Sequence, residues 1–136
     1  MPEPPDKIAL AFVDAINSGD LLALRALMTD SHTFTDARGA SFSGAEMMIR
    51  GWEHFHQAFP NYRITIDHIF VETNRVALIG YAEGGWRVNG VILPQHWHVS
   101  AAWLAEVVSR RIDHWTVFCD TAWTTPPITS EAGEVS

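Results

Sequence analysis

Apolar residues at the start of the chain recur at the spacing of an α-helix. Ile8, Phe12 and Ile16 lie four residues apart, which places them on one face of a helix. Asp6 can accept hydrogen bonds from the free N–H groups of a first turn, and Gly19 suits the left-handed backbone conformation that ends many helices. The pattern predicts a helix between Asp6 and Gly19.

Two more helices are predicted before Pro60. Asp20 can cap a short helix over residues 21–28. Ser43 and Glu46 have the S-x-x-E spacing of a capping box, which would open a third helix that Pro60 stops. The large apolar side chains on one face of this third helix are Met48, Trp52, Phe55 and Phe59.

After Pro60 the pattern becomes typical of β-strands. Four segments rich in β-branched and aromatic residues, at 62–72, 75–86, 92–108 and 110–123, are separated by short turn sequences, so consecutive strands should pair antiparallel. The segment "HTFTDARG" predicts a short strand or extended arm. The predicted class is α+β: a cone-shaped, curved antiparallel sheet, with about four long strands plus a short one, packed on three N-terminal helices.

The predicted domain spans residues 6–123. Residues 1–5 are rich in proline and predicted to be loose, and residues 124–136 are rich in Pro, Ser and Glu and predicted to be disordered. The chain of 136 residues is long enough to bury one core. A curled sheet that diverges from a covering helix leaves an apolar hollow, which is the default place for a small apolar molecule.

Charge and composition narrow the range of partners. The net charge of -7 would repel a phosphate backbone, so no nucleic-acid partner is expected. No run approaches the roughly 20 apolar residues of a membrane helix, and no secretion signal precedes the first helix. The lone Cys119 fits a reducing compartment and a packing role. We therefore expect a cytoplasmic protein that needs no membrane contact.

The stretch "PQHWHV" places His96 and His98 on one face of a strand, where both imidazoles could reach one metal ion. His114 on the next strand could supply a third ligand. The spacing from Gly90 resembles half of a cupin motif, but the glutamate that a cupin needs is absent, and Glu106 comes too late. We therefore predict no metal and no cofactor.

Strand alternation gives a second interpretation of the same histidines. In the last two strands, even-numbered residues share one face and odd-numbered residues share the other. We expect the even-numbered face to line the hollow, where a histidine beside a carboxylate could act as a general acid or base. The even-numbered residues are His96, His98, Ser100, His114, Thr116, Phe118 and Asp120.

The odd-numbered face carries three tryptophans. Trp97, Trp103 and Trp115 would form an aromatic patch too large to leave in water. The prediction is a homodimer through this face. The opposite assignment, with the tryptophans inside and the histidines facing solvent, stays open at this stage.

Several segments carry a resemblance to a known family. "FVDAINSGDLLALRALMTDSHTFTDARG", "FPNYRITIDHI" and "SAAWLAEVVSRRIDHWTVFCDTAW" resemble the nuclear transport factor 2-like superfamily, in its SnoaL-like and ketosteroid isomerase-like branch, over residues 6–123. The resemblance implies a cone-shaped α+β fold, a pocket inside the cone and, in many members, a dimer. The pocket would then include Phe12, Trp52 and Phe55.

The resemblance also implies candidate catalytic residues. The isomerases hold their general base in a segment like "TFTDARG", which places Asp36 at that position. Phe12 stands where they carry an oxyanion-binding tyrosine, and residues 98–102 contain no carboxylate for their second donor, which argues against a strict ketosteroid isomerase. The acid/base aspartate of SnoaL-type cyclases has its nearest match in Asp120.

The leading hypothesis is a cofactor-free enzyme of the cyclase or isomerase type that acts on a small apolar carbonyl compound. Asp36 would be the base, and His98 and Asp120 its polarising or proton-donating partners. The alternative is a module of the same fold that binds a small molecule or associates as a dimer without catalysis. A limonene-type epoxide hydrolase is disfavoured, since the required Asp-Arg-Asp arrangement is not evident on the strands.

Overall fold

The computed structural model describes residues 4–127, so the predictions for residues 1–3 and 128–136 lie outside the described part. The helices are α1 (Pro5–Ser18), α2 (Leu21–Ala26), α3 (Ala45–Ala58) and the short 3-10 helix η1 (Ala122–Thr124). Gly19 ends α1 with φ 68°, and the Asp20 side chain caps α2 by accepting from the N–H of Ala23 at 3.0 Å. These two signals were correctly identified in the sequence.

Two predicted helix starts differ from the structure. Helix α1 begins at Pro5 rather than after Asp6, because proline is tolerated in the first turn, where its missing N–H breaks no bond. Helix α3 follows Gly44 and has no side-chain cap. The Ser43 hydroxyl instead lies 2.9 Å from that of Thr33 on the neighbouring strand, so the predicted capping box does not form.

The main sheet has six strands in the order β2-β1-β8-β7-β4-β3, and a separate ribbon pairs β5 with β6. The strands are β1 (Met28–Thr35), β2 (Ser41–Ser43), β3 (Arg63–Glu72), β4 (Arg75–Gly84), β5 (Arg87–Val88), β6 (Val91–Ile92), β7 (Trp97–Val108) and β8 (Arg111–Cys119). The hairpins β3–β4 and β7–β8 and the β4–β7 pair are antiparallel as predicted. Strand β1, however, pairs parallel with β8, a long-range contact that local patterns do not reveal.

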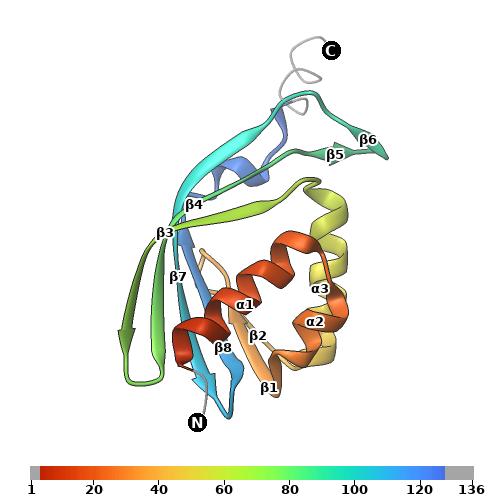
Figure 1. Ribbon diagram of the computed structural model, residues 1–136. Helices are drawn as coiled ribbons and strands as arrows, with labels where there is room; N and C mark the ends of the chain where they lie inside the picture. The colour runs from red at the N-terminus through yellow and green to blue at the C-terminus, as the bar shows by residue number, and fades with distance from the viewer. Residues whose placement is uncertain (1–3, 128–136) are drawn as a thin grey trace.

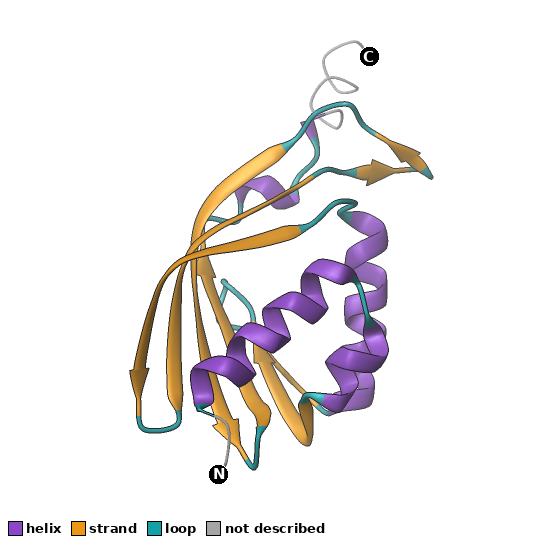
Figure 2. Cartoon of the chain, viewed as in Figure 1, coloured by secondary structure: helices purple, strands orange, loops and turns teal. Residues whose placement is uncertain are grey.

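The three helices lie on one side of the curved sheet (Figure 1), and the sheet does not close into a barrel (Figure 2). This confirms the predicted α+β class with three helices packed on a curved, mostly antiparallel sheet. None of the helices between residues 4 and 127 is long and apolar enough to cross a membrane.

The face that the helices cover carries the odd-numbered side chains of β7 and, from Trp115 onward, those of β8. A register shift before His114 turns the even-numbered Ile112 into the core as well. Trp97, Trp103 and Trp115 are only 5%, 2% and 1% exposed, and the Trp115 ring lies 4.8 Å from the ring of Phe12 on α1. The prediction that these tryptophans form a dimer interface is therefore wrong. Burying the indoles under the helices removes more apolar area from water than burying the histidines would, so packing selects the inverse orientation of both strands.

His32 is the fully buried polar side chain of the core, at 0% exposure. Its Nδ1 lies 2.8 Å from the carbonyl oxygen of Ile112, which can only accept, so this nitrogen carries the proton. Burial lowers the pKa of His32 below its ordinary value of 6.5, although the bond to Ile112 opposes the shift. The core therefore holds a neutral imidazole.

The His32 site predicts a loss of stability in acid. Above about pH 6.5 the imidazole is neutral in both folded and unfolded chains; below it the unfolded chain binds a proton that the folded chain resists, so stability falls by up to about 1.4 kcal/mol per pH unit. Urea unfolding at pH 7.5 and pH 5 should show a smaller pH effect in His32→Asn than in the wild type. The exposed His54→Asn is the matched control. Equal pH effects in wild type and His32→Asn would contradict this account.

Candidate functional site

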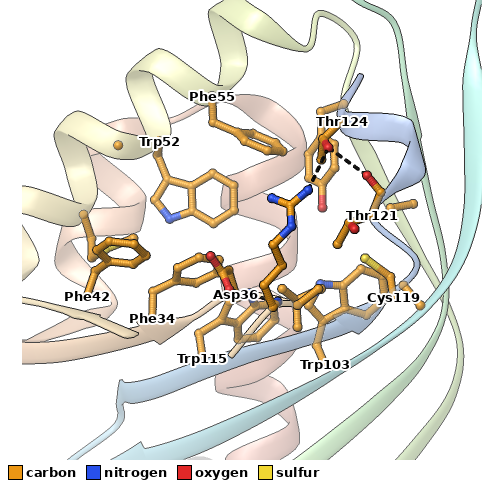
Figure 3. Close-up of a pocket in the computed structure, with 18 of the residues that line it drawn as sticks. Phe34, Asp36, Phe42, Trp52, Phe55, Trp103, Trp115, Cys119, Thr121 and Thr124 are labelled. Atoms are coloured by element: carbon orange, nitrogen blue, oxygen red, sulfur yellow. Dashed lines mark hydrogen bonds between the residues drawn. The ribbon is translucent and has the colours of Figure 1, made fainter. Parts of the chain in front are cut away.

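A cavity of about 410 Å³ lies between α3 and the helix-covered face of the sheet. Its wall is mostly aromatic and aliphatic, and the side chains labelled in Figure 3 converge on it from the sheet, α3 and the C-terminal segment. The lining residues on the sheet side are Phe34, Phe42, Ala82, Ala101, Trp103, Trp115, Val117 and Cys119. Those on α3 and in the connecting segments are Met47, Met48, Gly51, Trp52, Phe55, Tyr62, Asp36, Ala37, Arg38, Thr121, Trp123 and Thr124.

Asp36 directly follows β1, in the turn that leads to β2. Its Oδ1 accepts hydrogen bonds from the backbone N–H groups of Arg38 and Ala40, at 2.9 and 3.0 Å. These bonds are those of an Asx turn, which aspartate forms readily. The turn fixes the direction of the carboxylate, while Oδ2 has no hydrogen bond to any residue from 4 to 127. A half-buried carboxylate with one free oxygen thus borders the cavity.

Arg38 is the cation of the cavity wall. Its Nη2 lies 3.4 Å from the hydroxyl of Thr124, and the Thr124 hydroxyl donates to the carbonyl of Thr121 at 2.7 Å (Figure 3). The guanidinium forms no ion pair within 4.0 Å to any carboxylate in the described part of the chain. The contact between Arg38 and Thr124 joins the β1–β2 turn to η1.

An aromatic cluster closes the cavity beside η1. The indole rings of Trp97 and Trp123 stack with centroids 4.0 Å apart, and the indole N–H of Trp86 donates to the Trp123 carbonyl at 2.7 Å. Phe59 packs edge-on against both stacked rings. These contacts bring the segment after β8 back over the sheet, an arrangement that the sequence signalled only by an aromatic residue beyond the last strand.

Tyr62 and Cys119 are ionisable groups of this wall that stay uncharged. Burial raises the pKa of the Tyr62 phenol, and the neighbouring Cys119 adds to the shift. Burial likewise raises the pKa of the Cys119 thiol, with the Trp123 indole opposing the change. Cys119 is thus a packed neutral thiol on the cavity wall, in agreement with the packing role predicted for it.

The structure brings together only part of the predicted site. Asp36, which the resemblance suggested, lies on the cavity wall with Trp52 and Phe55, which the apolar face of the third helix suggested. Phe12 does not: it is fully buried between His32 and Trp115, in the core beneath the cavity. It is a packing residue, because its side chain is fully enclosed by the core and does not reach the cavity wall.

The even-numbered residues of β7 and β8 point away from the cavity, so their predicted placement in it is wrong. His98 is exposed and its ring lies 4.4 Å from that of Tyr81, and Ser100, which is also exposed, pairs with Tyr81 across the strands. Thr116 and Phe118 lie on the same outer face, and Phe118 is 54% exposed. These residues lie outside because β7 and β8 are oriented with their tryptophans toward the helices.

The other two histidines of the predicted site, His96 and His114, have hydrogen-bond partners on the outer face of the sheet. His96 precedes β7 and its Nε2 lies 3.0 Å from Oε1 of Glu83, and His114 Nε2 lies 2.8 Å from the Thr35 hydroxyl. Neither lines the cavity. Among residues 4–127, no three His, Cys, Asp or Glu side chains are placed to hold a metal ion.

Asp120 is also outside the cavity wall. Its side chain is exposed and its Oδ1 accepts from the backbone N–H of Ala122 at 2.7 Å, so it caps the turn that leads into η1. Asp120 follows the last residue of β8 and caps this turn, so its carboxylate is not at the predicted catalytic position.

The chain is similar to proteins of a known domain family and to solved structures. The SnoaL-like domain family matches residues 9–124, and no curated protein matches the chain. Solved structures share the fold. A protein of Shewanella putrefaciens CN-32, provisionally assigned as a SnoaL-like polyketide cyclase, is 19% identical, with 98% of each chain covered and a TM-score of 0.77.

Two other solved proteins share the fold. A hypothetical protein with a ketosteroid isomerase-like fold from Catenulispora acidiphila DSM 44928 is 22% identical, covers 85% of this chain and 86% of its own, and has a TM-score of 0.71. An LEH-like epoxide hydrolase of M. tuberculosis is 16% identical, covers 85% and 82%, and has a TM-score of 0.74. At such identities the likeness establishes the fold, which hosts more than one chemistry.

Proposed function

Because the chain belongs to the SnoaL-like domain family, we propose that its cavity takes a small apolar carbonyl compound and removes a proton from the carbon next to the carbonyl group, without a cofactor. The observation that carries this proposal is Asp36. It is the only carboxylate on the cavity wall within residues 4–127, and it borders a mostly apolar interior. A fixed carboxylate beside an apolar substrate is what general-base catalysis requires.

The proposed step transfers one proton. The C–H bond next to the carbonyl breaks, the proton bonds to Oδ2 of Asp36, and the electron pair moves into an enolate whose negative charge lies mostly on oxygen. Return of the proton to a different carbon gives a double-bond isomerisation. In an aldol-type cyclisation the enolate carbon instead bonds to a second carbonyl carbon of the same molecule. The π electron pair of that carbonyl moves to its oxygen, which takes the proton back from Asp36.

Deuterium exchange tests the proposal without knowledge of the natural substrate. The probe is 1-tetralone, a bicyclic ketone, incubated with the protein in D₂O and followed by proton NMR at the carbon next to the carbonyl. Exchange faster than in buffer, and dependent on Asp36, supports the proposal. A wild-type protein that binds 1-tetralone and leaves its exchange rate at the buffer value contradicts it.

The alternative is a binding module of the same fold that performs no chemistry. One contact favours it: Oδ1 of Asp36 already completes its own turn through the N–H groups of Arg38 and Ala40, a structural role that needs no substrate. The two functions differ in outcome, because a binding module would retain 1-tetralone without deuterium. Epoxide hydrolysis has less support, since its Asp-Arg-Asp arrangement needs two carboxylates on the wall and Asp36 supplies one.

We also propose a homodimer, through the outer face of the sheet instead of the tryptophan face. Phe70, Ile79 and Phe118 are 59%, 41% and 54% exposed, and Ile79 and Phe118 both pair with Ala102 across β4, β7 and β8. Exposed apolar patches of this kind mark association surfaces. Light scattering should give twice the mass of one chain, and Phe118→Ser should shift the mass toward one chain while the circular dichroism spectrum is retained. A wild-type protein with the mass of one chain would contradict the dimer.

A further inference from the structure

The indole N–H of Trp52 is a buried hydrogen-bond donor without an acceptor. Trp52 is 7% exposed, lies on α3 and contributes to the cavity wall. Its Nε1 has no hydrogen-bond partner among residues 4–127. Burying a polar N–H without an acceptor destabilises a folded chain, so such a donor in a cavity wall calls for an explanation.

The position of the Trp52 ring is fixed from several sides. Phe34 and Phe55 contact it edge-on, with centroid distances of 6.4 and 5.5 Å. The ring nitrogens of His56 lie 2.9 Å from the Trp52 carbonyl and 2.8 Å from the Ile16 carbonyl, which ties this turn of α3 to α1. The donor is therefore held in one place rather than free to turn toward another acceptor.

Figure 3 shows the Trp52 nitrogen on the ring edge that faces Phe34. Phe34 and Asp36 stand on either side of Thr35 at the end of β1, and both line the cavity with Trp52. Trp123 also has an indole nitrogen without a strong acceptor, but the Cys119 thiol lies beside it and can accept weakly.

We propose that the Trp52 N–H binds the carbonyl oxygen of the ligand and stabilises the enolate that forms when Asp36 takes the proton. This inference rests on the proposed function for its catalytic part, but the binding part stands by itself. Negative charge grows on the oxygen during proton removal, so a donor that contacts that oxygen binds the transition state more tightly than the ketone. The preferred ligand is then an apolar compound with a carbonyl oxygen, not a hydrocarbon of the same shape.

A matched ligand pair tests the binding part. 1-Tetralone and tetralin have the same ring system, and only 1-tetralone carries the oxygen. In proton NMR of the wild type, the Trp52 Nε1–H signal, assigned by its absence in Trp52→Phe and by its contacts to Phe34 and Phe55 protons, should move downfield with 1-tetralone and not with tetralin. A signal that stays in place up to the solubility limit of the ketone overturns the inference.

The substitution Trp52→Phe removes the N–H and keeps an aromatic ring. We expect affinity for 1-tetralone to fall roughly tenfold and affinity for tetralin to change less than about twofold, as the loss of one hydrogen bond predicts. The exchange rate kcat should fall by a further factor of about ten, while KM rises about as much as the dissociation constant of 1-tetralone. Equal losses for both ligands would mean that Trp52 only packs, and would overturn the proposal.

Tyr62 is the rival donor, because its neutral phenol also lines the cavity. Tyr62→Phe removes only its hydroxyl, and Tyr81→Phe on the outer face is the matched control. If Tyr62→Phe removes the preference for 1-tetralone and Trp52→Phe does not, the assignment to Trp52 is wrong.

The proposed function and this inference can fail separately. A ketone-dependent Trp52 shift without any exchange keeps the donor site and rejects the catalysis. Exchange that depends on Asp36 and is unchanged in Trp52→Phe keeps the catalysis and rejects the donor site.

Discussion

Replacing Asp36 with asparagine is expected to lower the rate of deuterium exchange into 1-tetralone about 100-fold or more. Removing a general base typically costs a factor of about 10² to 10⁴, and the wall has no other carboxylate within residues 4–127 that could replace it. The fold should survive, because the asparagine oxygen can still accept from the N–H groups of Arg38 and Ala40. Exchange rates of wild type and Asp36→Asn, measured side by side by proton NMR, check the prediction.

Asp120→Asn is the matched control for this experiment. It makes the same change of charge, and its amide oxygen can still accept from the N–H of Ala122. Asp120 does not line the cavity, so the Asp120→Asn variant should exchange deuterium into 1-tetralone at the wild-type rate. Full activity in Asp36→Asn, or an equal loss in Asp120→Asn, would reject Asp36 as the base.

Trp115→Ala is expected to lower the free energy of unfolding by about 3–5 kcal/mol, the typical cost of deleting a large aromatic side chain from a core. Trp115 is 1% exposed, contacts Phe12 on α1 and is paired with Phe34 on β1 and Ala105 on β7. It therefore joins the first helix to three strands. Urea unfolding monitored by circular dichroism measures the loss.

Thr116→Ala separates this effect from a general weakening of β8. Thr116 follows Trp115 directly but points to the outer face, so its truncation should cost less than about 1 kcal/mol. If the two substitutions lowered the free energy of unfolding by similar amounts, the orientation of β8 with Trp115 inside and Thr116 outside would be contradicted.

The local patterns in the sequence predicted most elements of the fold. The spacing of Ile8, Phe12 and Ile16 and the signals at Gly19 and Asp20 correspond to α1 and α2 as observed. The short turn sequences between the strands after Pro60 predicted the antiparallel hairpins. These features depend on neighbours in the chain, which is why the sequence reveals them. The parallel pairing of β1 with β8 depends on residues about 80 positions apart and has no local signal.

The candidate site also has one part that local sequence predicts and another part that only the tertiary structure brings together. Asp36 was identified because a short turn segment resembles a family motif, and the turn itself is local: the side chain bonds to N–H groups within four residues. Tyr62, Trp103 and Trp123 reach the same cavity from distant parts of the chain. Their meeting is set by how the helices and η1 close over the sheet, which no short segment encodes.

The sequence by itself determined which side chains share a face in β7, and in β8 after its register shift, because alternation is a property of any regular extended strand. It did not determine which face is inside. That was decided when the helices covered one side of the sheet, where burying Trp103 and Trp115 removes a large apolar area from water while His98 and Phe118 stay outside. A single strand is compatible with both orientations, and only the packed helices distinguish them.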